Sequence, residues 1–173
     1  MALVLRKPTR ALLQQRDQVG RRARLAIAAG AIMSVVALGP ALADNRPGQL
    51  DLAKYKGKVV YLDFWASWCG PCRLSFPYME LLRSAYARKE FVVIAVNVDH
   101  SRERADAFLN QVGGNVPVVY DPKGVIAAKY HVSEMPTSVL IGRDGRVRFV
   151  HQGFFETKTP QYESHIEELI NEK

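Results

Sequence analysis

Hydrophobic residues in this chain occur in short runs separated by polar segments, and these runs predict a sheet. Residues 59–65 and 91–98 are almost continuously apolar, which is the pattern of strands buried on both faces. Shorter apolar runs predict three more strands, at residues 116–120, 137–141 and 146–151. Asp144-Gly145 lies between the last two runs, and this pair is typical of a hairpin turn.

Helical periodicity fills the segments between the predicted strands. The expected helices span residues 72–88, 101–111 and 125–130, with a last helix from residue 159. Ser101 is placed to cap the second helix, and Thr159, followed by Pro160, to cap the last. The residues expected to face the sheet are Leu74, Leu81, Leu82, Ala85 and Tyr86 in the first helix and Tyr162, Ile166, Leu169 and Ile170 in the last. Strands that alternate with helices and end in a hairpin predict a mixed α/β sheet with helices on both faces.

The formal net charge of +7 is concentrated at the start of the chain. Residues 1–43 contain seven Arg or Lys and one Asp, whereas the other 130 residues contain 17 basic and 16 acidic side chains. The basic segment precedes an apolar stretch at 25–38 and then Ala41-Leu42-Ala43, a small-x-small cleavage pattern. We therefore expect residues 1–43 to be a cleavable export signal and residues 44–173 to be one soluble periplasmic domain. A nucleic-acid-binding tail is not expected, because an apolar run follows the basic residues.

Two features of this leader leave alternatives open. Its apolar core has 14 residues, fewer than the ~20 needed to span a bilayer, but extension to Leu42 would allow an uncleaved anchor in the inner membrane. Arg21-Arg22 before the core resembles a twin-arginine export signal, although Arg24 stands where a bulky apolar residue is common.

Cys69 and Cys72 are the only cysteines, and they follow the first strand where a helix is expected to begin. Thiols at i and i+3 lie on one face of a turn and can form a disulfide. The helix N-terminus favours a thiolate, so Cys69 can attack a disulfide and Cys72 can resolve the mixed disulfide that forms. We therefore expect Cys69 to be the exposed thiol and Cys72 the buried one. A structural bridge this short would stabilise the fold little. No metal site is expected, because the histidines are scattered without ligand spacing, at His100, His131, His151 and His165.

Asp63 lies between Tyr61 and Trp65 on one face of the first predicted strand. An unpaired charge is costly on a buried strand. Either the carboxylate reaches solvent at an edge, or its pKa is raised and it accepts the Cys72 proton. Trp65 is expected in the core, and Trp68 at the rim of a groove for the protein whose disulfide Cys69 would attack. The residues expected on the surface are Ser67, Arg73 and Ser75.

The segment from Val60 to Cys72, Val-Tyr-Leu-Asp-Phe-Trp-Ala-Ser-Trp-Cys-Gly-Pro-Cys, resembles the active-site segment of the thioredoxin superfamily. Met135-Pro136-Thr137 resembles the cis-proline loop of that fold, and Pro77 matches its helix kink. The 36 residues between Asp99 and Pro136 leave room for an extra helix and strand before that loop. With the leader, this insertion is similar to that of the exported TlpA/ResA/DsbE-type reductases.

The resemblance implies a thioredoxin-like fold and a monomeric reductant of protein disulfides that needs no cofactor. The implied catalytic residues are Cys69 (nucleophile), Cys72 (resolving), Asp63 (proton acceptor) and Pro136 (cis-Pro). The implied client contacts are Trp68, Gly70, Pro71 and Met135. Clients in this family include apocytochrome c and proteins of the oxidase copper site, and a membrane thiol carrier of the DsbD type supplies electrons.

Three positions depart from the family. Ser75 stands where many members carry Glu, Asp63 where Asn is common, and Ala95 where thioredoxins place a Lys that pairs with the acid. Three other functions stay open: a disulfide-forming oxidant, a copper carrier that uses both thiols with Met135 or a histidine, and a peroxidase. The Gly-Pro pair between the cysteines is thioredoxin-like and favours a reductant. A peroxidase would carry Thr where this chain has Ala66.

Overall fold

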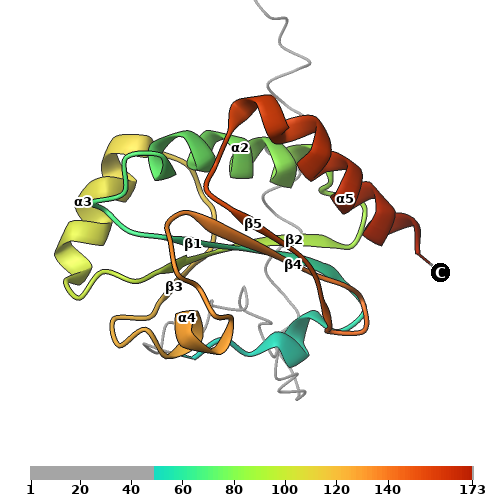
Figure 1. Ribbon diagram of the computed structural model, residues 1–173, viewed down its shortest axis with the longest axis horizontal. Coiled ribbons are helices and arrows are strands. Elements are labelled where there is room, and N and C mark those ends of the chain that lie inside the picture. Colours follow the sequence, from blue (N-terminus) through green and yellow to red (C-terminus); the bar gives the residue numbers. More distant parts are fainter. Residues whose placement is uncertain (1–48, 173) are drawn as a thin grey trace, which may run out of the picture. The chain divides into compact units, whose positions relative to one another are not determined.

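The computed structural model describes residues 49–172, and at its centre is a mixed sheet of five strands (Figure 1). The strand order is β3-β2-β1-β4-β5. The strands are β1 (Val59–Trp65), β2 (Phe91–Asn97), β3 (Val118–Tyr120), β4 (Thr137–Ile141) and β5 (Val147–Gln152). The expected export signal at 1–43, its cleavage site and the start of the mature chain lie outside the described residues.

The central strand is β1, in which all seven residues are buried. It pairs in parallel with β2 and antiparallel with β4, while β3 adds in parallel to β2 and β5 adds antiparallel to β4. This register places Asp63 opposite both Ala95 on β2 and Ser138 on β4, and it places Ser138 opposite His151 on β5. Residues directly opposite each other present their side chains to the same face. Four strands therefore contribute one row of side chains, Ala95, Asp63, Ser138 and His151, to one face of the sheet.

Helices cover both faces of the sheet, as the sequence predicts (Figure 1). One face carries α2 (Cys72–Ala85), α3 (Arg102–Val112) and α5 (Thr159–Asn171), and the other carries α4 (Val125–Lys129) and the 3-10 helix η1 (Leu52–Tyr55). A second 3-10 helix, η2 (Glu156–Lys158), leads into α5. The predicted extra helix and strand are present, because α3, β3 and α4 all precede the cis-proline loop. Among the described helices, none combines the length and hydrophobicity that a membrane span requires.

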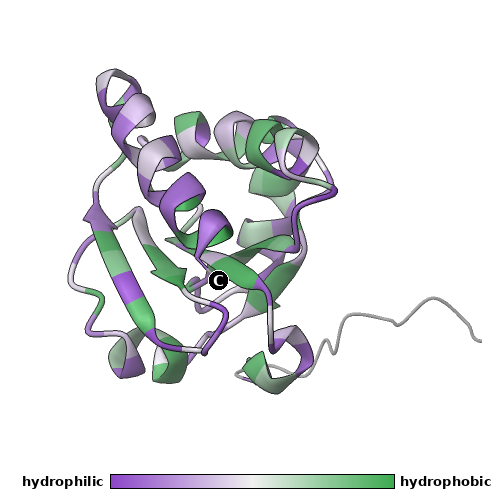
Figure 2. Cartoon of the chain, turned by 90° about the vertical axis from the view of Figure 1, so that its right-hand side faces the viewer, coloured by the Kyte–Doolittle hydropathy of each residue, from purple (hydrophilic) through white to green (hydrophobic). Residues whose placement is uncertain are grey.

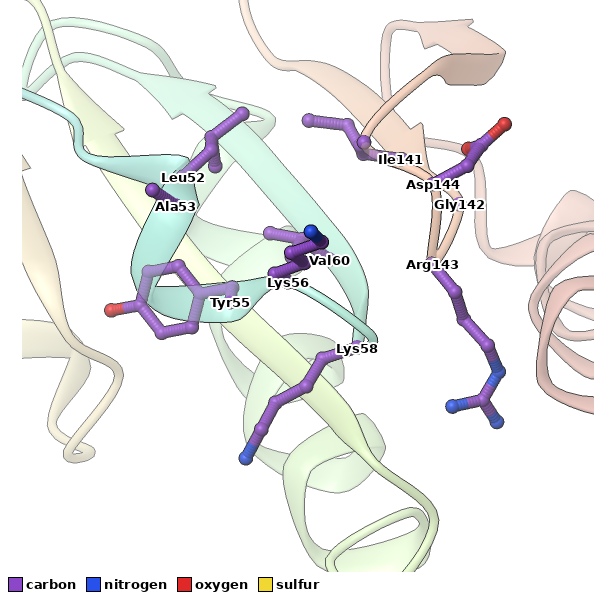
Figure 3. A pocket seen from close by; sticks show the side chains of 11 residues that line it. Leu52, Ala53, Tyr55, Lys56, Lys58, Val60, Ile141, Gly142, Arg143 and Asp144 are labelled. Atoms are coloured by element: carbon purple, nitrogen blue, oxygen red, sulfur yellow. The ribbon is translucent and has the colours of Figure 1, made fainter.

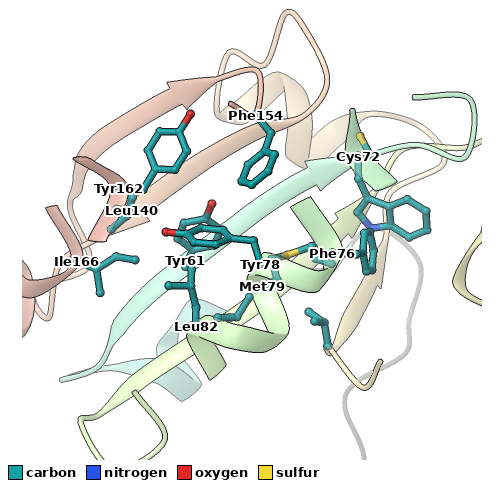
Figure 4. Packing of buried hydrophobic residues seen from close by; sticks show 14 of the residues in the cluster. Tyr61, Cys72, Phe76, Tyr78, Met79, Leu82, Leu140, Phe154, Tyr162 and Ile166 are labelled. Atoms are coloured by element: carbon teal, nitrogen blue, oxygen red, sulfur yellow. The ribbon is translucent and has the colours of Figure 1, made fainter. Parts of the chain in front are cut away.

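Hydropathy follows these layers. In Figure 2 the inner strands are largely hydrophobic, whereas the helices and one outer strand alternate between hydrophilic and hydrophobic residues. Next to the cysteines, the Trp65 ring lies 4.9 Å from both Phe76 on α2 and Phe108 on α3, between ring centroids, and all three rings are buried. Farther along α2, Leu82 packs in the same cluster as Ile166 of α5 (Figure 4). The core therefore joins the strand that precedes the cysteines to the helix that follows them.

The inward face predicted for the first helix is wrong at three of its five positions. Leu74 and Leu81 are exposed by 51% and 57%, and Ala85 is exposed as well, whereas Leu82 and Tyr86 are buried. The buried residues of α2 are instead Cys72, Ser75, Phe76, Tyr78, Met79 and Leu82. Their spacing of three and four residues gives the helix a single buried stripe, and Leu74 and Leu81 lie outside it. The helix also ends at Ala85 rather than at residue 88, with Pro77 in its interior.

The helix starts were predicted with mixed success. Ser101 caps α3 as expected, because its Oγ accepts the Arg104 N–H at 3.4 Å. Thr159 does not cap α5: it is the first helical residue, and its Oγ1 donates to the Glu156 carbonyl at 2.9 Å. Lys158 occupies the cap position, because η2 runs directly into α5 and leaves Thr159 no extended backbone from which to cap.

Candidate active site

The two cysteines lie where β1 gives way to α2. Cys72 is the first residue of the helix, Cys69 lies one turn before it, and their sulfurs form a disulfide. The Cys72 backbone N–H donates to Cys69 Sγ at 3.2 Å. A donor at a helix start stabilises negative charge on the atom that it reaches. This contact therefore favours a thiolate at Cys69 once the disulfide is reduced.

Cys69 is more exposed than Cys72, as expected, but it is far less exposed than expected. Cys72 is fully buried, and Cys69, which was expected to be exposed, keeps only 4% of its surface. The Cys69 N–H donates to the Ala66 carbonyl at 3.1 Å, and this turn folds Cys69 back against the core. Of the two cysteines, only Cys69 therefore keeps any exposed surface.

Asp99 fastens the segment that leads to Cys69, and the sequence analysis did not single it out. Its Oδ2 accepts the Ser67 N–H at 2.8 Å, its Oδ1 accepts the Ser67 hydroxyl at 2.9 Å, and the Asn97 side-chain amide donates to Oδ2 at 2.8 Å. The side chain is 5% exposed. Its place in the sequence could have identified it: Asp99 follows β2, and it therefore lies at the edge of the sheet where β1 ends, because the two strands are parallel.

Asp63 is completely buried, which excludes the alternative of a carboxylate that reaches solvent at an edge. Its Oδ2 accepts the Ser138 hydroxyl at 2.9 Å, and Ala95, on the neighbouring strand, supplies no charge. Burial raises the pKa of Asp63 from 3.8 to about 7, and the hydroxyls of Ser138 and Ser75 oppose that rise. An acid with this pKa can exchange a proton near neutral pH.

Ser75 is buried, with 1% exposure, so its expected place on the surface is wrong. The reason is helical phase: it lies three residues after Cys72, on the buried stripe of α2. Its Oγ donates to the Cys72 carbonyl at 3.1 Å, and the same hydroxyl lowers the pKa of Asp63. Ser75 therefore lies close to both Cys72 and Asp63. Ser67 is half-buried and Arg73 is exposed.

The Met135–Pro136 peptide bond is cis. The Pro136 carbonyl accepts the Gly153 N–H at 2.8 Å, and Thr137 Oγ1 donates to the Glu134 carbonyl at 2.8 Å, so the loop is held from both sides. The Met135 side chain is half-buried and packs against the core clusters on both faces of the sheet. Within residues 49–172 the Met135 N–H and carbonyl make no backbone hydrogen bond.

Exposed apolar and small residues surround the cysteines. Trp68 is 68% exposed, and Gly70 and Pro71 between the cysteines are exposed as well. Phe155, which sequence reasoning missed, is 50% exposed, and its ring lies against Gly153, the residue that bonds Pro136. No motif marks Phe155 in the sequence, because only the sheet brings the end of β5 to the cis-proline loop.

Within residues 49–172, no three side chains of His, Cys, Asp or Glu gather where they could hold a metal ion. His100 Nδ1 lies 2.8 Å from the Pro122 carbonyl oxygen, and His131 is exposed. His151 Nε2 and His165 Nδ1 lie 2.9 Å apart, so these two histidines bond each other between β5 and α5.

A hollow of about 240 Å³ lies at the other end of β1, between η1 and the turn from β4 to β5 (Figure 3). Val60 and Ile141 form part of its wall, and Lys58 and Arg143 stand at its margin. Arg143 donates to the carbonyls of Gly57 and Ile170, at 2.9 and 3.0 Å. The lining includes none of the residues around the cysteines, and its arginine is already occupied in joining segments of the fold.

The chain is similar to known proteins along most of its length. A family model described as Redoxin matches residues 27–169. The thiol-disulfide oxidoreductase ResA of Bacillus anthracis is 36% identical over 121 residues, which cover 70% of this chain and 69% of that protein. The ResA of Bacillus subtilis is 37% identical over 106 residues, which cover 61% of this chain and 59% of that protein.

Two solved structures share the fold. A protein from Chlorobium tepidum described as a thiol:disulfide interchange protein DsbE superposes with a TM-score of 0.69 at 44% identity, covering 72% of this chain and 91% of its own. The exposed lipoprotein thioredoxin of Streptococcus pneumoniae superposes with a TM-score of 0.61 at 31% identity, covering 68% of this chain and 90% of its own.

Proposed function

This chain belongs to the Redoxin family and is a thiol–disulfide oxidoreductase of the TlpA/ResA/DsbE type, and from that premise we propose that it is exported and reduces disulfides in client proteins. The observation that carries the proposal is the pair Cys69 and Cys72 at the start of α2, with the buried carboxyl of Asp63 on the strand that leads into it. This arrangement supplies a nucleophile, a resolving thiol and a proton acceptor.

In the first step, the Cys69 thiolate attacks one sulfur of a client disulfide. A bond forms between Cys69 Sγ and that sulfur, the client S–S bond breaks, and the other client sulfur leaves as a thiolate. The Cys72 N–H, 3.2 Å from Cys69 Sγ, supports the negative charge before the attack.

In the second step, Cys72 gives its proton to the Asp63 carboxylate and attacks Cys69 Sγ. The Cys69–client bond breaks, and the second client sulfur leaves with the electron pair. The protein ends with the Cys69–Cys72 disulfide, oxidised by two electrons. The two client thiolates take up one proton from Asp63 and one from solvent, so the client ends as a dithiol. Because the pKa of Asp63 is about 7, the acid can both take up and release this proton near neutral pH.

The client is proposed to bind as an extended strand against the cis-proline loop. The free N–H and carbonyl of Met135 can pair with its backbone, as in other cases of strand addition. Trp68, Gly70 and Pro71 would contact the client beside Cys69, and Phe155 adds an apolar surface next to Pro136.

The proposed setting is the periplasm, reached through the leader at residues 1–43. Free thiols in an oxidising compartment need a dedicated electron supply, which a membrane thiol carrier of the DsbD type would provide. The clients that the family resemblance suggests are apocytochrome c and proteins of the oxidase copper site. In this proposal the domain works as a monomer after the leader is removed; an uncleaved leader would instead tether the same domain to the membrane.

The reduction potential of the cysteine pair tests the direction of the reaction. After equilibration of the purified protein with defined thiol–disulfide buffers, a reductant should titrate near the thioredoxin value of about −270 mV, and an oxidant near about −120 mV. The reduced protein should also reduce insulin, and Cys69→Ser should abolish this activity. A potential near −120 mV would show a disulfide-forming oxidant. Tight binding of Cu(I) by the reduced thiols, without insulin reduction, would show a copper carrier.

A further inference from the structure

A chain of three buried polar side chains ends on Asp63. Tyr61 Oη donates to Ser138 Oγ at 2.7 Å, and Ser138 Oγ donates to Asp63 Oδ2 at 2.9 Å. Tyr61 is 1% exposed, Ser138 is 4% exposed and Asp63 is fully buried. A serine hydroxyl has one proton to donate. Because the Tyr61 hydroxyl already points a proton at the Ser138 oxygen, the Ser138 proton is directed at the carboxylate.

We propose that Ser138, oriented by Tyr61, is a positioning residue that holds the Asp63 carboxyl for proton transfer from Cys72. Ser138 engages Oδ2 only, and Asp63 Oδ1 has no hydrogen-bond partner within residues 49–172. The unengaged oxygen is the one that can receive a proton. This inference rests on the proposed function, since it assigns Ser138 to the second step of that reaction.

Ser138 also sets how readily Asp63 holds the proton. A hydrogen bond to a carboxylate stabilises the ionised form, and it counteracts the burial that raises the pKa of Asp63 to about 7. Without Ser138, Asp63 would stay protonated to a higher pH and could not accept the Cys72 proton near neutrality.

Of the other groups around Asp63, Ser75 acts in the same direction as Ser138, because its hydroxyl also lowers the pKa of Asp63. On β1, burial raises the pKa of Tyr61 well above its ordinary range, so Tyr61 stays protonated. The side of α2 contributes Ser75, and β2 contributes the apolar Ala95. On β5, burial, and then the neighbouring His165 and Lys158, lower the pKa of His151 to about 4, so His151 is neutral near pH 7. Across these elements, no charged side chain shifts the ionisation of Asp63.

The test separates the two steps with dithiobis(nitrobenzoate). This small aromatic disulfide releases one coloured thiolate when Cys69 attacks and a second when Cys72 resolves the mixed disulfide. The rate of the second release, measured across pH, reports the proton transfer from Cys72. The variants are Ser138→Ala, Ser138→Thr and Tyr61→Phe. The matched control is Tyr120→Phe, which removes a half-buried hydroxyl that bonds Asp106 instead of Asp63.

We expect Ser138→Ala to raise the pH of half-maximal second release by about one unit and to slow that release about fivefold at pH 7, because a hydrogen bond to a charged group is lost. The first release should be unchanged. Ser138→Thr should keep the wild-type profile, Tyr61→Phe should give a smaller shift in the same direction, and Tyr120→Phe should leave the midpoint in place.

If Asp63→Asn slows the second release but Ser138→Ala keeps the wild-type pH profile, the role of Ser138 is overturned and the proposed function stays intact. A rate that falls equally at every pH would also overturn it, because such a loss reflects structural damage. If Asp63→Asn leaves the second release unchanged, the proton-transfer role of Asp63 and the role of Ser138 fail together. Absence of any second release from the wild type would instead refute the proposed dithiol mechanism.

Discussion

Replacing the buried acid, Asp63→Asn, should stabilise the oxidised protein near and above pH 7, and the difference from the wild type should grow with pH. Folding raises the pKa of Asp63 from 3.8 to about 7. A group whose pKa is raised in the folded state contributes stability at low pH, and this contribution is lost as the pH rises from the unfolded value through the folded one. The amide introduced by Asp63→Asn does not titrate, so the variant should escape this loss.

The magnitude follows from linkage. With the two pKa values 3.8 and about 7, ionisation of Asp63 costs the fold about 1.7 kcal/mol at pH 5 and about 4 kcal/mol at pH 8. The amide would place an N–H donor near the unpartnered position of Oδ1, which costs about 1–3 kcal/mol at every pH. The difference in unfolding free energy between variant and wild type should therefore increase by about 2.5 kcal/mol from pH 5 to pH 8, whatever the cost of the amide.

Urea unfolding of the disulfide-bonded proteins, followed by far-ultraviolet circular dichroism, measures this difference. With a slope of about 1–3 kcal/mol per molar urea, the gap between the two midpoints should widen on the order of 1 M between pH 5 and pH 8. Asp144→Asn removes an exposed carboxylate from the turn before β5, and shows how much of the change comes from net charge alone. An equal gap between the two urea midpoints at pH 5 and at pH 8 would refute the assignment of a raised pKa to Asp63. The variant should also release a trapped client slowly while Cys69 still attacks at its normal rate.

Three further experiments test other parts of the account. Phe76→Ala, in the aromatic cluster, should lower the unfolding free energy by about 3–5 kcal/mol, whereas Leu81→Ala, on the exposed face of the same helix, should lower it by less than about 1 kcal/mol. Equal losses in thermal or urea unfolding would contradict the assignment of the buried face of α2. Asp121→Ala should lower the unfolding free energy by at least about 2 kcal/mol, because the buried carboxylate accepts the N–H groups of Val125 and Ala127 at 2.8 and 2.9 Å. Asp51→Ala, at the exposed cap of η1, should lower it by less than about 1 kcal/mol. Mass spectrometry of the periplasmic protein should find a mature chain that begins at Asp44; an intact leader in membrane fractions would show an anchor.

Much of the sheet could be predicted from the sequence, because buried strands have strongly apolar patterns. The predicted strands at 59–65 and 137–141 agree with β1 and β4 to the residue. The inward face of α2 could not be predicted in the same way, since Leu74 and Leu81 lie outside the buried stripe that contains Phe76 and Leu82. Leucine is apolar on either face, and only packing against α3 and α5 decides which stripe is buried.

Part of the candidate site could also be predicted from the sequence, and part could not. Cys69, Cys72 and Asp63 fall within ten residues of one another, so a local pattern reveals them. Ser138 reaches Asp63 across 75 residues of sequence, and Asp99 reaches Ser67 across 32. Those contacts depend on the register of β1 with β4 and β2, and no short pattern records that register.

The most direct test of the central claim, that Cys69 attacks and Cys72 resolves, is to trap the mixed disulfide. Cys72→Ser and Cys69→Ser proteins, each reduced and then exposed to insulin and to a periplasmic extract, are separated without reductant and identified by mass spectrometry. The account predicts that Cys72→Ser accumulates complexes joined through Cys69, that reductant releases them, and that Cys69→Ser accumulates none. Complexes joined through Cys72 in the Cys69→Ser protein, with none formed by Cys72→Ser, would contradict it.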